Sequence, residues 1–349
     1  MRKNACRKTK STDYPIDFVV LWVDGSDPVW LKNRQKYEHK SIPELQARYR
    51  DWGTFKFWFR GVEKYAPWVN HVFLVTDSQK PEWLNEKHSK LTIVDHKDIM
   101  DKKDLPTFNS QAIELNLHKI PGLSEHFVYF NDDTFIINRV KPSDYFKDGL
   151  PVEMANINAA TGMEGDQLYA QTMFNNVLLI NRHFKKNEIM KRHLMKWLNP
   201  KYGIMFNLRT LSQMPYPFFT GYKPQHLSTS FLKNTFKEVW TSESEVLSNT
   251  CSHKFRHRED INQDAFVMWQ LCCNCFTPRA YSFGKHLMLK DENSARTAAK
   301  TILSNRKKMI CINDGISSDE YAKEVDLMKN IIIKAFNKKF PEESKYEKK

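Results

Sequence analysis

Several features that would assign this chain to a specialised class are missing from its 349 residues. A membrane-spanning helix needs about 20 apolar residues, and every apolar run in this sequence is much shorter. The run from Phe18 to Val23 is typical in length. The basic start, Met1 to Lys10, leads into no apolar segment of the secretory type. Low-complexity tracts and clear repeats are absent too. We therefore expect an intracellular globular protein of one large domain or two, with a substantial core.

Cysteine is also sparse, with six residues in the whole chain. Without a secretory segment, we expect free thiols and no disulfide framework. Cys272, Cys273 and Cys275 lie close together in the sequence but lack the paired Cys-x-x-Cys spacing of a zinc site. We interpret them as small residues of the core.

Acidic residues are outnumbered, with 41 Asp and Glu against 54 Lys and Arg, which gives a net charge of +13. Such a chain favours anionic partners, namely nucleic acid, anionic lipid or phosphorylated substrates. Because no zinc finger, RNA-binding sheet motif or basic zipper is present, we do not expect nucleic acid. Apolar residues at helical spacing from Tyr321 to Phe336 predict a helix, which more often packs on a core than lies on a membrane.

The most informative stretch runs from Phe127 to Phe135. Its aromatic and apolar first half is typical of a strand buried on both faces, and the run ends in Asp132 and Asp133. In open α/β sheets, ligands bind beyond the carboxyl ends of the strands, where paired carboxylates can hold a divalent cation against a diphosphate. Successive strand residues face opposite sides, so the two share a cation only if the chain already turns there. A turn that caps the next segment is the alternative.

Strand and helix patterns alternate along the first part of the chain. The predicted strands cover 16–23, 69–77, 91–95 and 127–131, and they end on Asp24, Asp77, Asp95 and Asp132. Helices are predicted over 30–37, 54–65 and 111–119. This alternation predicts an α/β fold with a parallel sheet and helices on both sides.

The pattern loosens beyond about residue 150, where strands over 152–157 and 176–181 and a helix over 182–198 are predicted. We expect a basic tail over 1–15 and a catalytic α/β domain over 16–290, whose acceptor-side part begins near residue 150. A C-terminal helical segment with a basic tail is expected over 291–349.

Polar residues where loops meet helices are the remaining candidates. Gly25 allows close approach of the backbone to a ligand, and Asp27 or Ser26 can cap the next helix, which alone would explain this segment. Arg50 is a candidate for gripping phosphate oxygens, although most arginines simply stay solvated. His118, one helical turn after Glu114, is either an acid or base or a structural histidine.

Helix starts supply further candidates. Asn109 or Ser110 is the expected cap of a helix whose free amides would suit phosphate. The Pro- and aromatic-rich loop 216–226 suits a sugar platform or packs on the core; within it, Lys223 and His226 could reach a reacting oxygen. Arg256 and Arg258 could receive phosphate, while Asp260 or Asn262 would cap the following helix.

The order of these stretches resembles the Stealth family of sugar-phosphate transferases. This family includes bacterial capsular polysaccharide phosphotransferases and the catalytic subunit of the lysosomal-enzyme N-acetylglucosamine-1-phosphotransferase. Its first block resembles Asp17 to Asp27. Its second, which is long and specific, resembles Arg48 to Asp51, Glu63 to Val69, Val75 to Asp77, Pro81 to Asn85, Leu105 to Ser110, His118 and Tyr129 to Asp133. The third and fourth resemble Lys223 to His226 and Arg256 to Asn262 more loosely.

The resemblance implies a Rossmann-like, glycosyltransferase-A-like α/β/α sandwich with helical additions. It implies a phosphotransferase for substituted phosphate groups, which moves N-acetylhexosamine-1-phosphate or hexose-1-phosphate from a UDP-sugar to a glycan hydroxyl and releases UMP. Capsule or cell-surface polysaccharide synthesis is the implied process. Mg²⁺ or Mn²⁺ on Asp132 and Asp133 would neutralise the diphosphate. His226 is our first choice for the base and His118 our second. Asp27, Arg256 and Asp260 complete the predicted catalytic set, and the predicted donor-binding residues are Asp24, Gly25, Arg50, Asn109, Ser110, Lys223 and Asn262.

Two other functions stay open at this point. One is a conventional nucleotide-sugar glycosyltransferase that releases UDP, and the other is a basic protein that binds glycan or membrane without turnover. The expected partners are a nucleotide-diphosphate sugar and an oligosaccharide or polysaccharide acceptor, with lipid linkage and an anionic membrane surface as further candidates. We expect a cytoplasmic protein, peripheral at the inner face of a bacterial plasma membrane.

Overall fold

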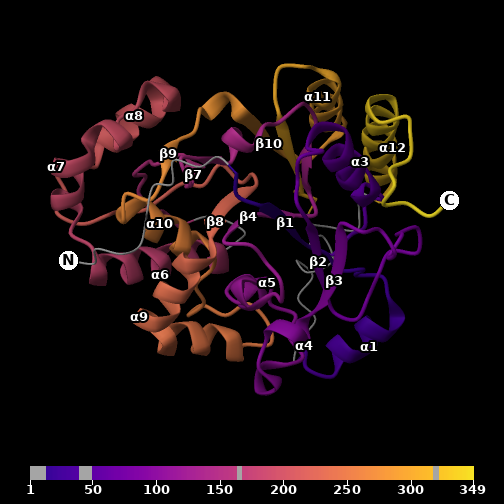
Figure 1. The fold of residues 1–349 in the computed structure, drawn as a ribbon, viewed down its shortest axis with the longest axis horizontal. Helices are drawn as coiled ribbons and strands as arrows, with labels where there is room; N and C mark the ends of the chain where they lie inside the picture. Colours follow the sequence, from indigo (N-terminus) through magenta and orange to yellow (C-terminus); the bar gives the residue numbers. More distant parts are fainter. Residues whose placement is uncertain (1–12, 39–48, 163–166, 317–321) are drawn as a thin grey trace.

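A five-stranded sheet lies at the centre of the protein in a computed structural model, which describes residues 13–38, 49–162, 167–316 and 322–349 (Figure 1). The strand order is β3-β2-β1-β4-β8, in which the first four strands are parallel and β8 is antiparallel to β4. The strands are β1 (Ile16–Leu21), β2 (Val72–Thr76), β3 (Leu91–Asp95), β4 (His126–Asn131) and β8 (Thr229–Leu232). The four predicted strands are therefore confirmed.

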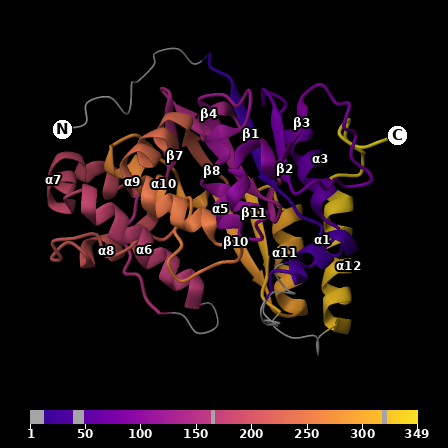
Figure 2. The ribbon, with the colours of Figure 1, turned by 90° about the horizontal axis from the view of Figure 1, so that it is seen from below.

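Alternate residues of each central strand enter two separate cores. In β1, Val19 belongs to one core, while Phe18 and Val20 belong to the other. The first core is covered by α5 (Ser110–Glu114), α6 (Gln167–His183), α9 (Lys233–Ser252) and α10 (Asp264–Cys272). The second is covered by α3 (Phe55–Tyr65), α11 (Glu292–Leu303) and α12 (Ala322–Lys339). The α/β/α sandwich with helical additions is thus confirmed (Figures 1 and 2).

Two smaller sheets flank the central one. The first has the order β10-β11-β5, formed by β10 (Gly284–Leu289), β11 (Met309–Asp314) and β5 (Thr134–Ile136). The second consists of β6 (Phe146–Lys147), β7 (Leu150–Glu153) and β9 (Thr277–Pro278). Because β5 follows the acidic pair directly, its antiparallel pairing with β11 brings the C-terminal part of the chain beside that pair. The remaining helices are α1 (Pro28–Gln35), α4 (His96–Ile99), α7 (Lys186–Trp197) and α8 (Gly203–Ser212).

One secondary-structure prediction was wrong and two were only partly right. Residues 176–181 lie inside α6, because a short apolar run does not distinguish a strand from a buried helix. The helix predicted over 111–119 ends at Glu114 and resumes as a 3₁₀ turn at Leu117. Between them, the side chain of Asn116 bonds the carbonyl of Ala112 at 2.8 Å and competes with the helical pattern. The strand predicted over 152–157 covers only Leu150–Glu153.

The end of the chain is docked on the protein. Tyr346 and Glu347 are buried, and the carboxylate of Glu347 accepts two hydrogen bonds from the guanidinium of Arg60, at 2.8 and 2.6 Å. The predicted helix near the C-terminus is α12, which packs its apolar face on the core through Met328 and Phe336. Ser344, Tyr346 and Glu347 thus pack on the protein, while Lys345, Lys348 and Lys349 are exposed. The basic N-terminal residues 1–12, Arg48 and Tyr321 lie outside the described residues.

The prediction of thiols holds for Cys251, Cys272 and Cys311 and fails for Cys275. The first three are free thiols, whereas Cys275 is disulfide-bonded. A disulfide requires two cysteines with Cα atoms about 6 Å apart, and sequence spacing does not reveal such proximity.

Candidate active site

A cavity of about 1620 Å³ opens at the carboxyl ends of β1 and β4. These two strands are neighbours in the sheet. From β1, the strands β2 and β3 are added on one side and β4 on the other, so the direction in which strands are added reverses between β1 and β4. Such a reversal is where open α/β sheets leave a crevice for ligands. Among the predicted site residues, Asp24, Arg50, Ser110, Asp132, Asp133, Lys223, His226, Arg256 and Asn262 line the cavity.

The acidic pair forms the turn between β4 and β5, so its carboxylates need not point to opposite faces of the sheet. Burial raises the pKa of Asp132 to about 7, and the neighbouring charge of Asp133 adds to this effect. Asp133 accepts hydrogen bonds from the hydroxyl of Thr134, at 3.0 Å, and from the amide of Asn313. A carboxyl whose pKa is raised beside a second carboxylate fits Mg²⁺ or Mn²⁺, which take oxygen ligands and would offset the repulsion between the two groups.

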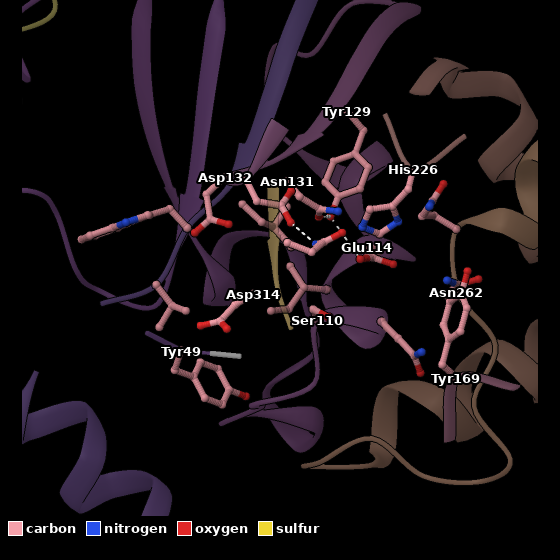
Figure 3. A pocket seen from close by; sticks show the side chains of 18 of the residues that line it. Tyr49, Ser110, Glu114, Tyr129, Asn131, Asp132, Tyr169, His226, Asn262 and Asp314 are labelled. Carbon is pink, nitrogen blue, oxygen red and sulfur yellow. Dashed lines mark hydrogen bonds between the residues drawn. The ribbon is translucent and has the colours of Figure 1, made fainter. Parts of the chain in front are cut away.

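Asn313 and Asp314, at the end of β11, also line the cavity. Figure 3 shows Asp314 beside it. Asp314 forms a salt bridge of 2.6 Å with Arg50 and accepts the backbone N–H of Ile316 at 2.9 Å. Arg50 therefore already has a carboxylate partner inside the cavity. Both β11 residues were missed in the sequence, although they repeat the signal of polar residues at a strand end.

The loop after β1 separates two predicted roles. Asp24 lines the cavity, and its backbone N–H is held by the side chain of Gln79 at 2.9 Å. Asp27 instead caps α1 by accepting the N–H of Val29 at 2.7 Å, while a hydrogen bond from Gln79 lowers its pKa. Neither Asp27 nor Gly25 is among the lining residues. A Cβ on Gly25 would lie 2.3 Å from the Cβ of Tyr49, so glycine is required by close packing here.

Asp260 is fully buried and does not line the cavity, but its contacts hold the segments that carry Ser110 and Arg256. Its carboxylate is bonded to the amide of Asn109 at 2.8 Å and to the ring of His253 at 2.6 Å. Asn109 also caps α5 and is buried away from the cavity. This network holds the loop from which Arg256 reaches the hydroxyl of Ser110, at 3.1 Å, at the cavity wall. Asp260 and Asn109 thus position lining residues.

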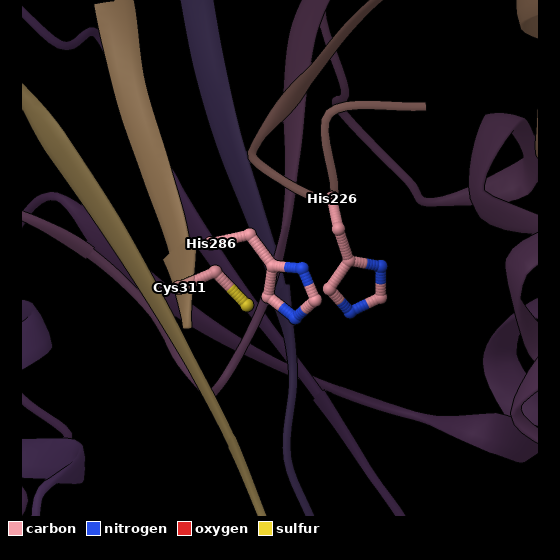
Figure 4. A group of neighbouring side chains, drawn as sticks. All are labelled: His226, His286 and Cys311. Atoms are coloured by element: carbon pink, nitrogen blue, oxygen red, sulfur yellow. The ribbon is translucent and has the colours of Figure 1, made fainter. Parts of the chain in front are cut away.

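His226 occupies a left-handed backbone conformation, with φ of 50°, and its ring centroid lies 4.9 Å from that of His286. Figure 4 shows the two rings together with Cys311; one nitrogen of each ring and the sulfur of Cys311 lie within 4.8 Å of one another. His286 bonds the amide oxygen of Asn313 through Nε2, which must carry the proton because that oxygen only accepts. Since Asn313 also donates to Asp133, a continuous polar contact joins the histidine pair to the acidic pair.

His118 lies outside the cavity lining, against the rings of Phe236 and Trp240, and burial lowers its pKa to about 4. Its expected helix partner Glu114 does line the cavity (Figure 3). Glu114 accepts the hydroxyl of Tyr129 at 3.1 Å, and its second oxygen has no hydrogen-bond partner among the described residues. Burial raises the pKa of Glu114 to about 7, which brings it into the range of a general base.

Three further charged lining residues escaped the sequence analysis. Arg279 and Glu153 form a buried salt bridge, and Arg279 also bonds the carbonyl of Ser228 at 3.1 Å. Burial raises the pKa of Asp264 to about 6, an effect that the nearby His226 opposes. Their sequence positions, inside or just beside predicted core segments, carry no signal that distinguishes them from ordinary buried polar residues.

Family models and curated relatives match most of this chain. Conserved regions 1, 2 and 4 of Stealth proteins match residues 14–42, 48–153 and 300–349. The chain is 42% identical over 341 residues to the exopolysaccharide phosphotransferase cps2G of Lactiplantibacillus plantarum, covering 97% of this chain and 98% of that protein. It belongs to the Stealth family. The family's fourth region thus falls on residues 300–349, which corrects our placement of the last block at Arg256 to Asn262.

Other Stealth relatives are similarly close. The chain is 39% identical to a capsular polysaccharide phosphotransferase WcwK of Streptococcus pneumoniae, over 96% of this chain and 98% of that protein. It is 38% identical to the receptor polysaccharide phosphotransferase WefC of Streptococcus oralis, over 95% and 99%. Among solved structures, it is similar to the galactosyltransferase LgtC with donor and acceptor sugar analogues, at a TM-score of 0.40 and 9% identity over 91% of this chain and 95% of that one. This Stealth chain is a phosphotransferase enzyme.

Proposed function

We propose that this Stealth protein transfers a hexose-1-phosphate or N-acetylhexosamine-1-phosphate from a UDP-sugar to a hydroxyl of a capsular or exopolysaccharide acceptor. The observation that carries this proposal is the meeting of the acidic pair and a cationic wall in one cavity. Asp132 and Asp133 lie at the strand ends, and Lys223, His226 and Arg256 line the same space. With a volume of about 1620 Å³, this cavity is larger than the roughly 300–1,000 Å³ of single-ligand pockets and has room for donor and acceptor together.

In the proposed reaction, the acceptor oxygen attacks the phosphorus atom that carries the sugar. The bond to the bridging oxygen breaks, and UMP leaves as a phosphodiester forms between sugar and acceptor. Arg256 and Lys223 face the charge that develops on the phosphoryl oxygens, which is the main requirement of phosphoryl transfer. Mg²⁺ or Mn²⁺ held by Asp132 and Asp133 would supply further neutralisation when bound.

The acceptor's proton requires a base at the cavity wall. His226 keeps its place as our first choice, because it lines the cavity and its ring packs against a second histidine. Glu114 replaces His118 as the second choice, because it lines the cavity and His118 does not. Asp27, Asp260, Gly25 and Asn109 support this site by capping or by close packing. The proposed setting is the cytoplasmic face of the plasma membrane, where a lipid-linked acceptor would be available.

The released nucleotide tests the reaction. Purified protein is incubated with UDP-sugars, a polysaccharide acceptor and Mg²⁺ or Mn²⁺, the nucleotide is separated chromatographically, and the new linkage is examined by phosphorus NMR. UMP together with a phosphodiester is the expected result. UDP as the sole nucleotide would assign the protein to conventional glycosyl transfer, and a lack of turnover with every donor would favour a binding protein.

The acidic pair is tested by single changes that keep the side-chain size. Asp132→Asn and Asp133→Asn should each lower turnover by at least a hundredfold, since each removes a charge from the cation site. Asp326→Asn is the matched control, because it makes the same change at an exposed carboxylate of α12 that does not line the cavity, and it should leave turnover unchanged. If both single variants turned over donor as the wild type does, no cation would act at this pair.

A further inference from the structure

The helices α7 and α8 project from the side of the molecule that lies farthest from α3 and α12 (Figures 1 and 2). We define the α7–α8 arm as residues 186–218, which include both helices and the loop that follows them. In α8, Ile204, Leu208 and Leu211 are 80%, 55% and 47% exposed. Their spacing of four and three residues places them on one face of the helix, so α8 presents an apolar stripe to solvent.

Exposed apolar side chains are concentrated on this arm. Of the sixteen large hydrophobic residues that are exposed in the described part of the chain, eight fall between residues 194 and 218. These eight are Leu194, Met195, Ile204, Met205, Leu208, Leu211, Tyr216 and Phe218. A stretch of 25 residues thus carries half of this exposed surface, whereas single exposed apolar residues elsewhere are ordinary. The concentration indicates a surface that something covers.

The charge around the apolar stripe has one dominant sign. From Lys185 to Phe218 the chain has seven Lys and Arg residues and a single carboxylate, Glu188. Two of these cations serve the fold: Lys186 bonds two carbonyl oxygens of the arm at 2.7 and 2.9 Å, and Lys196 bonds the carbonyl of Phe276 at 2.7 Å. Four others, Lys185, Lys191, Arg192 and Lys201, are exposed. Among them, Lys201 bonds the carbonyl of Pro278 at 3.3 Å, and Lys185 and Arg192 lie 3.8 and 3.9 Å from the carboxylate of Glu188.

An anionic lipid bilayer matches this combination better than a protein surface does. Interfacial helices combine an apolar face with Lys and Arg on the polar side. This arm likewise has an exposed apolar face on α8 and exposed cations on α7 and in the segments that flank it. Protein interfaces, in contrast, are depleted in Lys. None of the described helices has the length and apolar content needed to cross a bilayer, so contact through this arm would be peripheral.

We propose that the α7–α8 arm binds the surface of an anionic membrane, with the apolar face of α8 at the boundary between the headgroups and the acyl chains. The proposal rests on the exposed side chains and does not depend on which reaction the cavity performs. It places the cavity near the bilayer, because the chain runs from the end of the arm at Phe218 into the cavity lining at Tyr222, Lys223 and Pro224. An acceptor that is attached to a lipid would then reach the site without leaving the membrane.

Vesicle sedimentation of the full chain tests this surface. The probes are vesicles of phosphatidylglycerol with phosphatidylethanolamine and vesicles of phosphatidylcholine alone. The wild type should bind the anionic vesicles, and the double variant Ile204→Glu with Leu208→Glu should bind them at least tenfold more weakly. The double variant Leu303→Glu with Leu327→Glu makes the same charge change at exposed sites on α11 and α12, and it should bind within twofold of the wild type.

Two further measurements make the result decisive. The pair Ile204→Ser and Leu208→Ser adds no charge, so a loss of binding by this variant as well assigns the effect to apolar contact. Nucleotide release on a water-soluble acceptor should be equal in all variants, which separates this proposal from the reaction itself. Equal vesicle binding by the arm and control variants would overturn the proposal. So would a wild-type dimer in light scattering that the arm variants dissociate, because a second copy of the chain would then cover the stripe.

Discussion

The carboxyl of Glu114 provides a quantitative test of the cavity's electrostatics. Glu114 is 7% exposed, and burial raises its pKa from 4.5 to about 7, an effect that Arg256 opposes and Asp264 reinforces. Between these two values the native protein keeps a proton that the unfolded chain has lost. The free energy of unfolding therefore falls as pH rises through this window. At about 1.4 kcal/mol for each pH unit, the loss reaches roughly 3 kcal/mol above pH 7.

Glu114→Gln removes this titration while keeping an oxygen that can accept the hydroxyl of Tyr129. Urea unfolding of both proteins at a series of pH values from about 5 to 8 measures the difference in free energy of unfolding. The free energy of unfolding of the variant minus that of the wild type should rise steadily with pH, by a total of about 2–3 kcal/mol. Glu292→Gln, at an exposed i,i+4 ion pair with Arg296, is the control and should show no such trend. A pH-independent difference for Glu114→Gln would show that burial does not hold the proton on this carboxyl.

Other changes test the framework around the cavity. Arg60→Met leaves a buried carboxylate unpaired near the C-terminus and should lower the free energy of unfolding by about 3–5 kcal/mol, measured by urea unfolding. Gly25→Ala should weaken donor binding in calorimetry by several-fold, because the new methyl group collides with Tyr49, which lines the cavity. Asn313→Ala removes the amide that holds Asp133 and should weaken Mn²⁺ binding about 10–100-fold; unchanged affinity would exclude a role for this contact.

The parts of the fold that could be predicted are those that depend on local pattern. The strand from His126 to Asn131 is buried on both faces and is rich in aromatic residues, so its type and its end were readable from the sequence. The rule that ligands gather at strand ends then placed Asp24, Asp132 and Asp133 in one cavity. No long-range information was needed for this step, because parallel strands present the same end at the same edge of a sheet.

The parts that could not be predicted depend on distant pairing or on competition for the same side chain. Asp314 joins the site because β11 pairs with β5, which lies about 170 residues earlier in the chain, and no local pattern encodes that contact. Glu114 faces the cavity and His118 does not, since the helix breaks near Asn116. Asp27 and Asp260 have the residue type of catalytic groups, but their oxygens are occupied by the amides and rings that they hold.

The three matched Stealth regions meet at the reversal of the strand order, and this meeting gives the C-terminal region a defined role. Region 1 supplies β1 and Asp24, and region 2 supplies the acidic pair. Region 4 supplies Asn313, whose amide donates to Asp133 and whose oxygen accepts from His286. Because one amide contacts both Asp133 of the acidic pair and His286, a shift of β11 would displace both together. Region 4 is also held near its end, because Glu347 accepts two hydrogen bonds from Arg60. These contacts restrain the segment that carries Asn313.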